Sequence, residues 1–281
     1  MASDARRAPR VIILGTDFSA GSKNALSRAI QIAKRHGAAI HVVHAAPRIP
    51  RAIARKFPFA DERKLRAALD GLIDQIREAG LCARPHLTQG DPVKALTVKA
   101  RALAADLVVV GARGQAVPDA MIGSTAERFI ALDRHRVLLV RRPATRAYGE
   151  VLIAANEESR LEDQVAAAAL FSSDPPSVLH VYEGPFESVL RSHGASSAEL
   201  RSYREFARRE AEPRMTKLIG KAGLERARLV LRHGNAVQLL QRVARDSLLV
   251  LSRGRSVVRH LLFGSVTRAV VAHGGSDVLL V

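Results

Sequence analysis

The sequence contains no tryptophan, and aromatic residues make up only 4% of its 281 positions. A core built around large rings is therefore excluded. The 47% of hydrophobic residues must pack mainly through alanine, valine, leucine and isoleucine, which is typical of helices covering a parallel sheet. A chain of this length and hydrophobic content is expected to form about two domains, and global disorder is excluded.

Cysteine is nearly absent, because Cys82 is the only one. A single thiol forms no internal disulfide, which favours a reducing compartment. No histidine, asparagine or aspartate pattern around Cys82 indicates a nucleophile. We interpret this residue as a small, partly buried apolar side chain.

Long apolar runs are missing too. The first one, residues 11–14, is too short for the hydrophobic region of a secretory signal. No stretch approaches the roughly 20 apolar residues that span a bilayer. We therefore expect a cytoplasmic protein without membrane contact.

Acidic residues are scarce relative to basic ones, 27 against 44, which gives a net charge of +17. This excess predicts long-range attraction to polyanions, including nucleic acid. The basic residues are spread over predicted helices without interleaved aromatics that would stack on bases. Any contact with nucleic acid is therefore expected to be non-specific.

An internal repeat is the main positive feature of the sequence. Residues 11–17 and 151–156 are short apolar runs that end in polar residues, and each precedes an alanine-rich helical stretch. Each copy continues with a second apolar strand that ends in histidine, a long excursion into a helix, and a third strand. A fourth strand, a loop, a helix and a last strand complete each copy, at 137–140 and 278–281.

Alternating strands and helices predict parallel sheets with right-handed crossovers. Residues 141–149 contain Pro143 and Gly149 and form the predicted linker. The expected domains are therefore residues 1–142 and 149–281.

Glycines near the fourth strand of the first copy indicate an anion site. Gly111-Ala112-Arg113-Gly114 follows this strand directly, and Gly123-Ser124 opens the next helix. Glycine lets a ligand approach the backbone, and a helix N-terminus attracts phosphate. Together these glycines would hold a nucleotide, with its ribose near Gly111 and its phosphates over Gly114, Gly123 and Ser124. The second copy has Gly254 and Gly264-Ser265, but Leu251 stands at the position we align with Gly111. A leucine in place of Gly111 is expected to block the sugar.

Polar residues also stand at the ends of other predicted strands. Asp17 ends the first strand, where it either faces a ligand crevice or caps the next helix. Asn156 takes its place in the second copy. His44 and His180 end the second strands and are interpreted as structural, because no partners with metal-ligand spacing accompany them. We predict neither a metal site nor a catalytic group.

The repeat, the run Thr16-Asp17-Phe18-Ser19 and residues 106–140 together resemble the universal stress protein family, nearest its ATP-binding branch. That branch carries Gly, two residues, Gly, nine residues, then Gly-Ser or Gly-Thr. Eight residues separate Gly114 from Gly123, and nine separate Gly254 from Gly264. The resemblance implies two tandem five-stranded parallel sheets of order 3-2-1-4-5, flanked by helices, in an adenine nucleotide alpha hydrolase-like α/β fold.

The resemblance also implies site residues. In the first domain the expected ATP contacts are Asp17, Ala45, Gly111, Arg113, Gly114, Gly123, Ser124 and Thr125. In the second domain the counterparts, expected to form a degenerate site, are Asn156, Val181, Arg253, Gly254, Gly264, Ser265 and Val266. A divalent cation such as Mg²⁺ would accompany bound ATP.

Three functions follow as alternatives: a stress-response regulatory protein that binds ATP in its first domain, with at most slow hydrolysis; a nucleotide-free interaction scaffold; and a non-specific polyanion binder. Family members often dimerise through the last strand. We therefore expect the two last strands, 137–140 and 278–281, to pair as an intramolecular pseudo-dimer, with a further homodimer left open.

Overall fold

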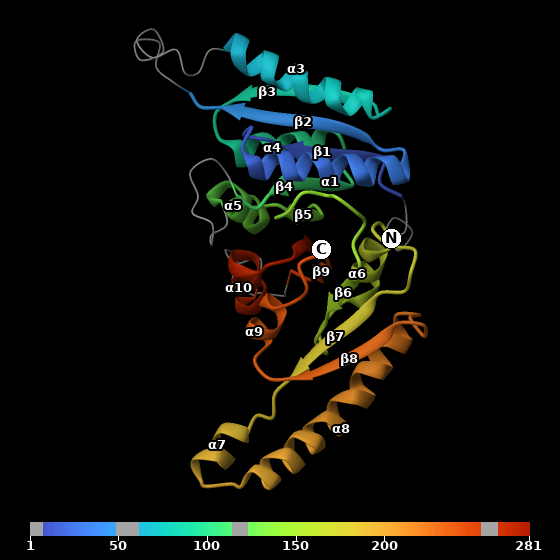
Figure 1. The fold of residues 1–281 in the computed structure, drawn as a ribbon, viewed down its shortest axis with the longest axis vertical. Coiled ribbons are helices and arrows are strands. Elements are labelled where there is room, and N and C mark those ends of the chain that lie inside the picture. The colour runs from blue at the N-terminus through green and yellow to red at the C-terminus, as the bar shows by residue number, and fades with distance from the viewer. Residues whose placement is uncertain (1–7, 49–61, 114–122, 254–263) are drawn as a thin grey trace.

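Strands and helices alternate along both halves of the chain, as expected (Figure 1). The computed structural model describes residues 8–48, 62–113, 123–253 and 264–281. The first half comprises β1 (Val11–Gly15), α1 (Ala20–His36), β2 (Ala39–Ala46), α3 (Glu62–Glu78), β3 (Ala83–Gln89), α4 (Pro92–Ala102), β4 (Leu107–Gly111), α5 (Ser124–Leu132) and β5 (Val137–Val140).

Among the described residues, the second half repeats this order with one short helix more. It comprises β6 (Val151–Ala154), α6 (Leu161–Ala168), β7 (Ser177–Tyr182), α7 (Glu187–Ser192), α8 (Ser197–Lys221), β8 (Arg228–His233), α9 (Ala236–Gln241), β9 (Leu248–Leu251), α10 (Ser265–His273) and β10 (Asp277–Leu280). The sequence predicted the helix that ends near residue 222 but not α7, which lies within the excursion before it.

The strands form one sheet of order β3-β2-β1-β4-β5-β10-β9-β6-β7-β8. Each half has the expected order 3-2-1-4-5, and all neighbours within a half are parallel. The halves join because β5 and β10 pair antiparallel, with Val278 opposite Leu139 and Leu280 opposite Val137. The expected pairing of the two last strands is thus present, and it turns two half-sheets into one continuous sheet.

The antiparallel junction decides where ligand sites can lie. Within each half the carboxyl ends of the parallel strands share one edge, which is where ligands of open α/β sheets bind. At the junction those two edges point in opposite directions, because β5 and β10 are antiparallel, and the twist between successive strands reduces this angle farther from the junction. Each candidate site is therefore formed by the strand ends of its own half.

Two apolar cores cover the two faces of the sheet, and both continue through the junction. One joins α1, α3, α6 and α8 to inward-facing strand residues that include Leu138 and Leu279. The other joins α4, α5, α9 and α10 to residues that include Val137 and Val278. The alternation of β5 and β10 residues between the two cores is the period of two expected for a strand covered on both faces.

The outer strands β3 and β8 are more exposed than the strands between them. Of the residues in β3, only Ala83 is buried, and Arg84 and Gln89 are exposed. Cys82 precedes this strand and is exposed, so its interpretation as a partly buried residue is wrong. Charged and polar side chains are common on edge strands, where they discourage pairing with other chains.

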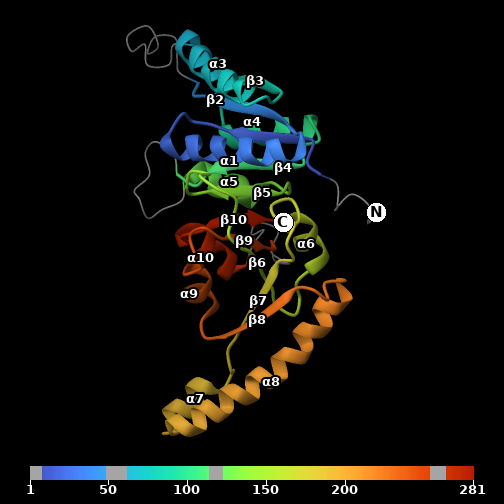
Figure 2. The same cartoon turned by 45° about the vertical axis from the view of Figure 1, so that its right-hand side comes forward.

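Helices α7 and α8 extend beyond the sheet at the end of the second half (Figure 2). A capping box of Ser196 and Glu199 begins α8, which runs 25 residues to Lys221. Glu187 anchors the pair by accepting hydrogen bonds from Arg204 Nε at 3.0 Å and from His233 Nε2 at 2.6 Å. The Arg204 contact, followed by that of His233, lowers the pKa of Glu187 to about 2.

No helix of the described residues is long and apolar enough to cross a membrane.

Candidate nucleotide sites

Asp17 lies half-buried after β1, but it does not cap the next helix. Ser19 is the N-cap of α1, because its hydroxyl accepts a hydrogen bond from the Ser22 N–H at 3.2 Å. The Asp17 carboxylate instead accepts from the Ser19 N–H at 3.0 Å. The capping alternative is therefore wrong, and Asp17 belongs to the turn at the carboxyl end of β1.

The two histidines have matching structural contacts. His44 Nδ1 lies 2.8 Å from the Thr16 carbonyl oxygen, and His180 Nδ1 lies 2.9 Å from that of Ala155. Both rings are buried and tie the second strand of each half to the turn after its first strand. These contacts agree with the structural role predicted for both residues, and they establish that Asp17 and Asn156 occupy equivalent positions.

Gly111 meets protein rather than open space. A Cβ atom at Gly111 would lie 2.5 Å from the carbonyl carbon of Gly21, and one at Gly21 would lie 2.1 Å from the Arg113 oxygen. Ser19 also donates its hydroxyl to that oxygen at 3.3 Å. Both glycines are thus required by the close approach of α1 to the segment after β4. This physical need for glycine is distinct from the sugar contact that the sequence suggested.

The first turn of α5 completes the first candidate site. Gly123 is its N-cap, in an extended conformation, and its N–H donates to the Ala112 carbonyl at 2.7 Å. This bond places Ser124 and Thr125 beside the end of β4. Gly114 lies outside the described residues. Ala45 lies half-buried near the end of β2, opposite Thr88 of β3.

An exposed ion pair near this edge was missed by the sequence analysis. Asp91, the N-cap of α4, accepts a hydrogen bond from Arg128 Nη2 of α5 at 2.8 Å. The Lys94 N–H and, after it, the Arg128 side chain lower the pKa of Asp91. The motif Gly90-Asp91-Pro92 is typical of a helix start, but nothing in it identifies Arg128 as the partner.

The strand register corrects the comparison of the two copies. Val110 pairs with Leu139 in the first half, and Leu251 pairs with Leu280 in the second. Leu139 and Leu280 are equivalent in the repeated sequence Val-Leu-Leu-Val. The counterpart of Leu251 is therefore Val110, and that of Gly111 is Ser252. Leu251 does not occupy the glycine position that we expected it to block.

The same register also places Arg253 away from its expected role. The Ala112 N–H bonds to the Val140 carbonyl, and the Arg253 N–H bonds to that of Val281, so these two residues are equivalent. Arg253 Nη1 donates to the carbonyls of Ile130 at 3.1 Å and of Asp133, and Nη2 donates to that of His135 at 2.5 Å. Its guanidinium thus caps the end of α5 in the first half. Burial lowers its pKa to about 10, although Asp133 opposes this shift.

A cavity of about 350 Å³ lies at the carboxyl end of the second half-sheet. The predicted residues that line it are Asn156, Val181, Gly264, Ser265 and Val266. The sequence analysis missed most of its apolar wall, including Leu179 and Leu240. Gly254 lies outside the described residues.

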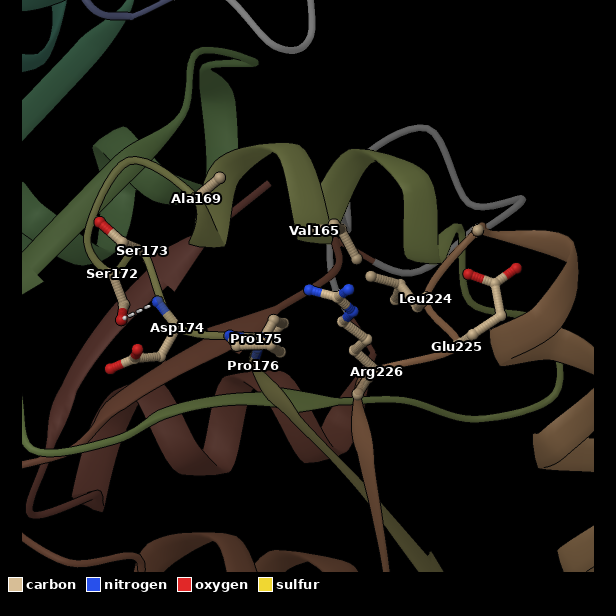
Figure 3. A pocket seen from close by; sticks show the side chains of 12 residues that line it. Val165, Ala169, Ser172, Ser173, Asp174, Pro175, Pro176, Leu224, Glu225 and Arg226 are labelled. Atoms are coloured by element: carbon tan, nitrogen blue, oxygen red, sulfur yellow. Dashed lines mark hydrogen bonds between the residues drawn. The ribbon is translucent and has the colours of Figure 1, made fainter.

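A second cavity, of about 410 Å³, lies at the opposite edge of the same half (Figure 3). Its lining includes Val165 of α6, Pro175 and Pro176 before β7, and Leu224 and Arg226 before β8. These residues lie at the amino-terminal ends of the strands, so this cavity is separate from the predicted nucleotide positions.

The fold and the strand-end sites define a tandem α/β protein built from two doubly wound halves. The sequence profile of the universal stress protein family matches residues 9–141 and again 148–281, and the chain belongs to this family.

Individual relatives agree with this assignment. The universal stress protein in the QAH/OAS sulfhydrylase 3′ region of Thermus aquaticus is 34% identical over a 142-residue alignment, which covers 47% of this chain and 98% of that protein. Among solved structures, a universal stress protein of Archaeoglobus fulgidus DSM 4304 has a TM-score of 0.69 at 18% identity, covering 96% of this chain and 97% of its own. A protein of unknown function from Pseudomonas aeruginosa PAO1 has a TM-score of 0.66 at 18% identity, covering 99% and 94%. At these identities the two structures support the fold alone.

Proposed function

We propose that the chain is a stress-response regulatory protein that binds ATP at the carboxyl edge of its first half-sheet, together with a divalent cation such as Mg²⁺. Hydrolysis is at most slow. The expected contacts are Asp17 and Ala45 on the adenosine side, and the segment around Gly111 with the start of α5 on the phosphate side.

The observation that supports this proposal best is the convergence of three segments. The turn after β1 reaches the segment after β4 through Ser19 and Arg113, and that segment reaches the start of α5 through Ala112 and Gly123. Asp17 and the first N–H groups of α5 therefore belong to one connected edge. A carboxylate suits a ribose hydroxyl, and the helix N-terminus suits a phosphate.

A titration of the intact chain with ATP and Mg²⁺ by calorimetry tests the proposal. Gly123→Val should weaken binding at least tenfold, because a branched side chain stands where phosphate would approach the helix start. The matched control is Gly264→Val, at the N-cap of α10 in the second half. A Cβ atom there meets nothing within 4 Å, so this variant should bind ATP as the parent does.

Whether the purified protein already carries bound nucleotide is an independent test of the proposal. Nucleotide released by acid, together with a raised ratio of absorbance at 260 and 280 nm, would support the proposal. A chain that neither carries nor binds nucleotide would instead support an interaction scaffold. Equal weakening by the two glycine variants would contradict the assignment of the site to the first half.

A further inference from the structure

Three charged positions at the carboxyl edge of the first half are occupied by uncharged residues in the second. Asp17 corresponds to Asn156, because each accepts a hydrogen bond from the N–H two residues later. Asp91 corresponds to Asn235, because these residues cap α4 and α9 in the same way. Counting from the caps Gly123 and Gly264, Arg128 corresponds to Ala269. Each of these charged positions of the first half is therefore neutral in the second.

Two further positions at this edge are more apolar in the second half. Ala45 follows His44, and Val181 follows the equivalent His180. In the first turns of α5 and α10, Thr125 corresponds to Val266. Val181 and Val266 both line the 350 Å³ cavity, so these replacements lie in its wall.

The cavity wall carries no charge among the residues described for it. Its apolar part is formed by Leu179, Val181, Leu240, Leu251 and Val266. Several of its polar side chains already have partners within the wall. Ser159 donates its hydroxyl to Asn156 Oδ1 at 2.8 Å, and the Thr267 hydroxyl donates to the Ser252 carbonyl at 3.4 Å.

An ion entering this space would lose its hydration, and no opposite charge in the described wall would replace it. A volume of about 350 Å³ lies within the range of small-molecule sites, roughly 300–1,000 Å³. We propose that the cavity of the second half binds a small uncharged molecule with a predominantly apolar body, rather than a nucleotide. The inference is independent of ATP binding in the first half, because every residue described for this cavity belongs to the second half.

Binding of the uncharged fluorophore 1-aminoanthracene to the intact chain tests the inference, since its emission rises in apolar surroundings. Val266→Asp should weaken binding at least tenfold, because it places a carboxylate in the wall. The fold should tolerate this change, since an acidic residue in the first turn of a helix is favourable. Val189→Asp is the matched control, because Val189 is an exposed valine on α7 outside the cavity, and it should leave binding unchanged.

A second variant keeps the test decisive if the charge disturbs folding. Val181→Trp fills the cavity with apolar volume and should also weaken binding of the fluorophore. Saturating ATP should not displace it, and binding should persist whether or not the first half takes up nucleotide. Wild-type affinity in both cavity variants, or competitive displacement by ATP, would overturn the inference.

Discussion

Arg28 and Asp277 meet across the junction of the two halves, with Arg28 Nε 3.6 Å from Asp277 Oδ2 and only 7% and 3% of their side chains exposed. Tyr148 of the linker donates its hydroxyl to the same carboxylate at 2.7 Å, and the Arg141 N–H donates to its other oxygen at 2.8 Å. The Arg28 guanidinium also lies 3.8 Å above the Tyr148 ring. Burial raises the pKa of Asp277, although the hydrogen bonds from Arg141 and Tyr148 oppose that shift.

Asp277→Ala should therefore lower the free energy of unfolding by about 3 kcal/mol or more, because it leaves a buried arginine without its carboxylate. Urea denaturation at pH 7 measures the loss. Asp246→Ala is the control, because Asp246 pairs with Arg146 of the linker at 3.0 Å, but through exposed side chains. An exposed pair contributes at most about 1 kcal/mol. Similar losses in the two variants would show that burial of the Asp277 pair does not matter.

The cap that Arg253 provides for α5 leads to a second prediction. Arg253→Leu removes a buried guanidinium from three carbonyls. It should cost about 2–4 kcal/mol, because each hydrogen bond to a charged group contributes about 1.5–3 kcal/mol and the desolvation of the buried charge offsets part of their sum. Hydrogen exchange should accelerate most at the last turn of α5, although the substitution lies in the other half. Arg268→Leu, which breaks only an exposed pair with Glu127, should leave that turn unchanged.

The repeat made most of the fold predictable. The alternation of apolar runs and helices located the strands to within a few residues, and the resemblance supplied their order. The junction was also foreseeable, because two apolar strands at sheet edges need a cover. The positions of Asp17, Gly111, Gly123 and Asn156 at carboxyl strand ends followed from the same pattern.

The remaining features depend on contacts that local patterns do not encode. The sequence analysis aligned Leu251 with Gly111 because it matched the second copy to the glycine motif of the first. The strand register instead places Ser252 at the position of Gly111. The reach of Arg253 into the other half requires the antiparallel junction to be known first. The exposure of Cys82 follows from the place of β3 at the edge of the sheet. Residue type alone could not reveal any of these.

A pair of histidines predicts how stability changes with pH. His41 Nδ1 lies 2.9 Å from His86 Nε2. Burial, followed by the charges of Lys99, His41 and Arg84, lowers the pKa of His86 to about 4, and burial with Arg84 and Lys99 also lowers that of His41. The unfolded chain, with histidine pKa values near 6.5, then binds more protons than the folded one. Stability should fall as the pH drops from about 6.5 towards 4.

The variant His86→Gln isolates this effect, because other titrating groups contribute equally to both proteins. The difference in unfolding free energy between parent and variant should change in this pH interval by less than about 1.4 kcal/mol per pH unit for each histidine. Urea titrations at pH 7.5, 5.5 and 4.5 measure it. A difference that stays constant across this interval would contradict the assignment.

The strand pair β5–β10 carries the last prediction. The β10 residues Val278, Leu279 and Leu280 are fully buried, as are their partners in β5, and together they contribute to both cores. Deleting residues 278–281 removes these side chains and also leaves the backbone N–H and C=O groups of β5 without their neighbouring strand. An unpaired apolar edge is a template for association. The deletion should therefore produce oligomers or aggregates, which sedimentation and light scattering would detect.

Replacing Val278, Leu279 and Leu280 together by alanine is the matched control, because it removes core volume but keeps the backbone that pairs with β5. That variant should be less stable, by about 2–5 kcal/mol for each large side chain lost if the sites do not relax, and should remain monomeric wherever it still folds. If the deleted protein is as soluble and as stable as the parent, β10 does not protect the edge of β5.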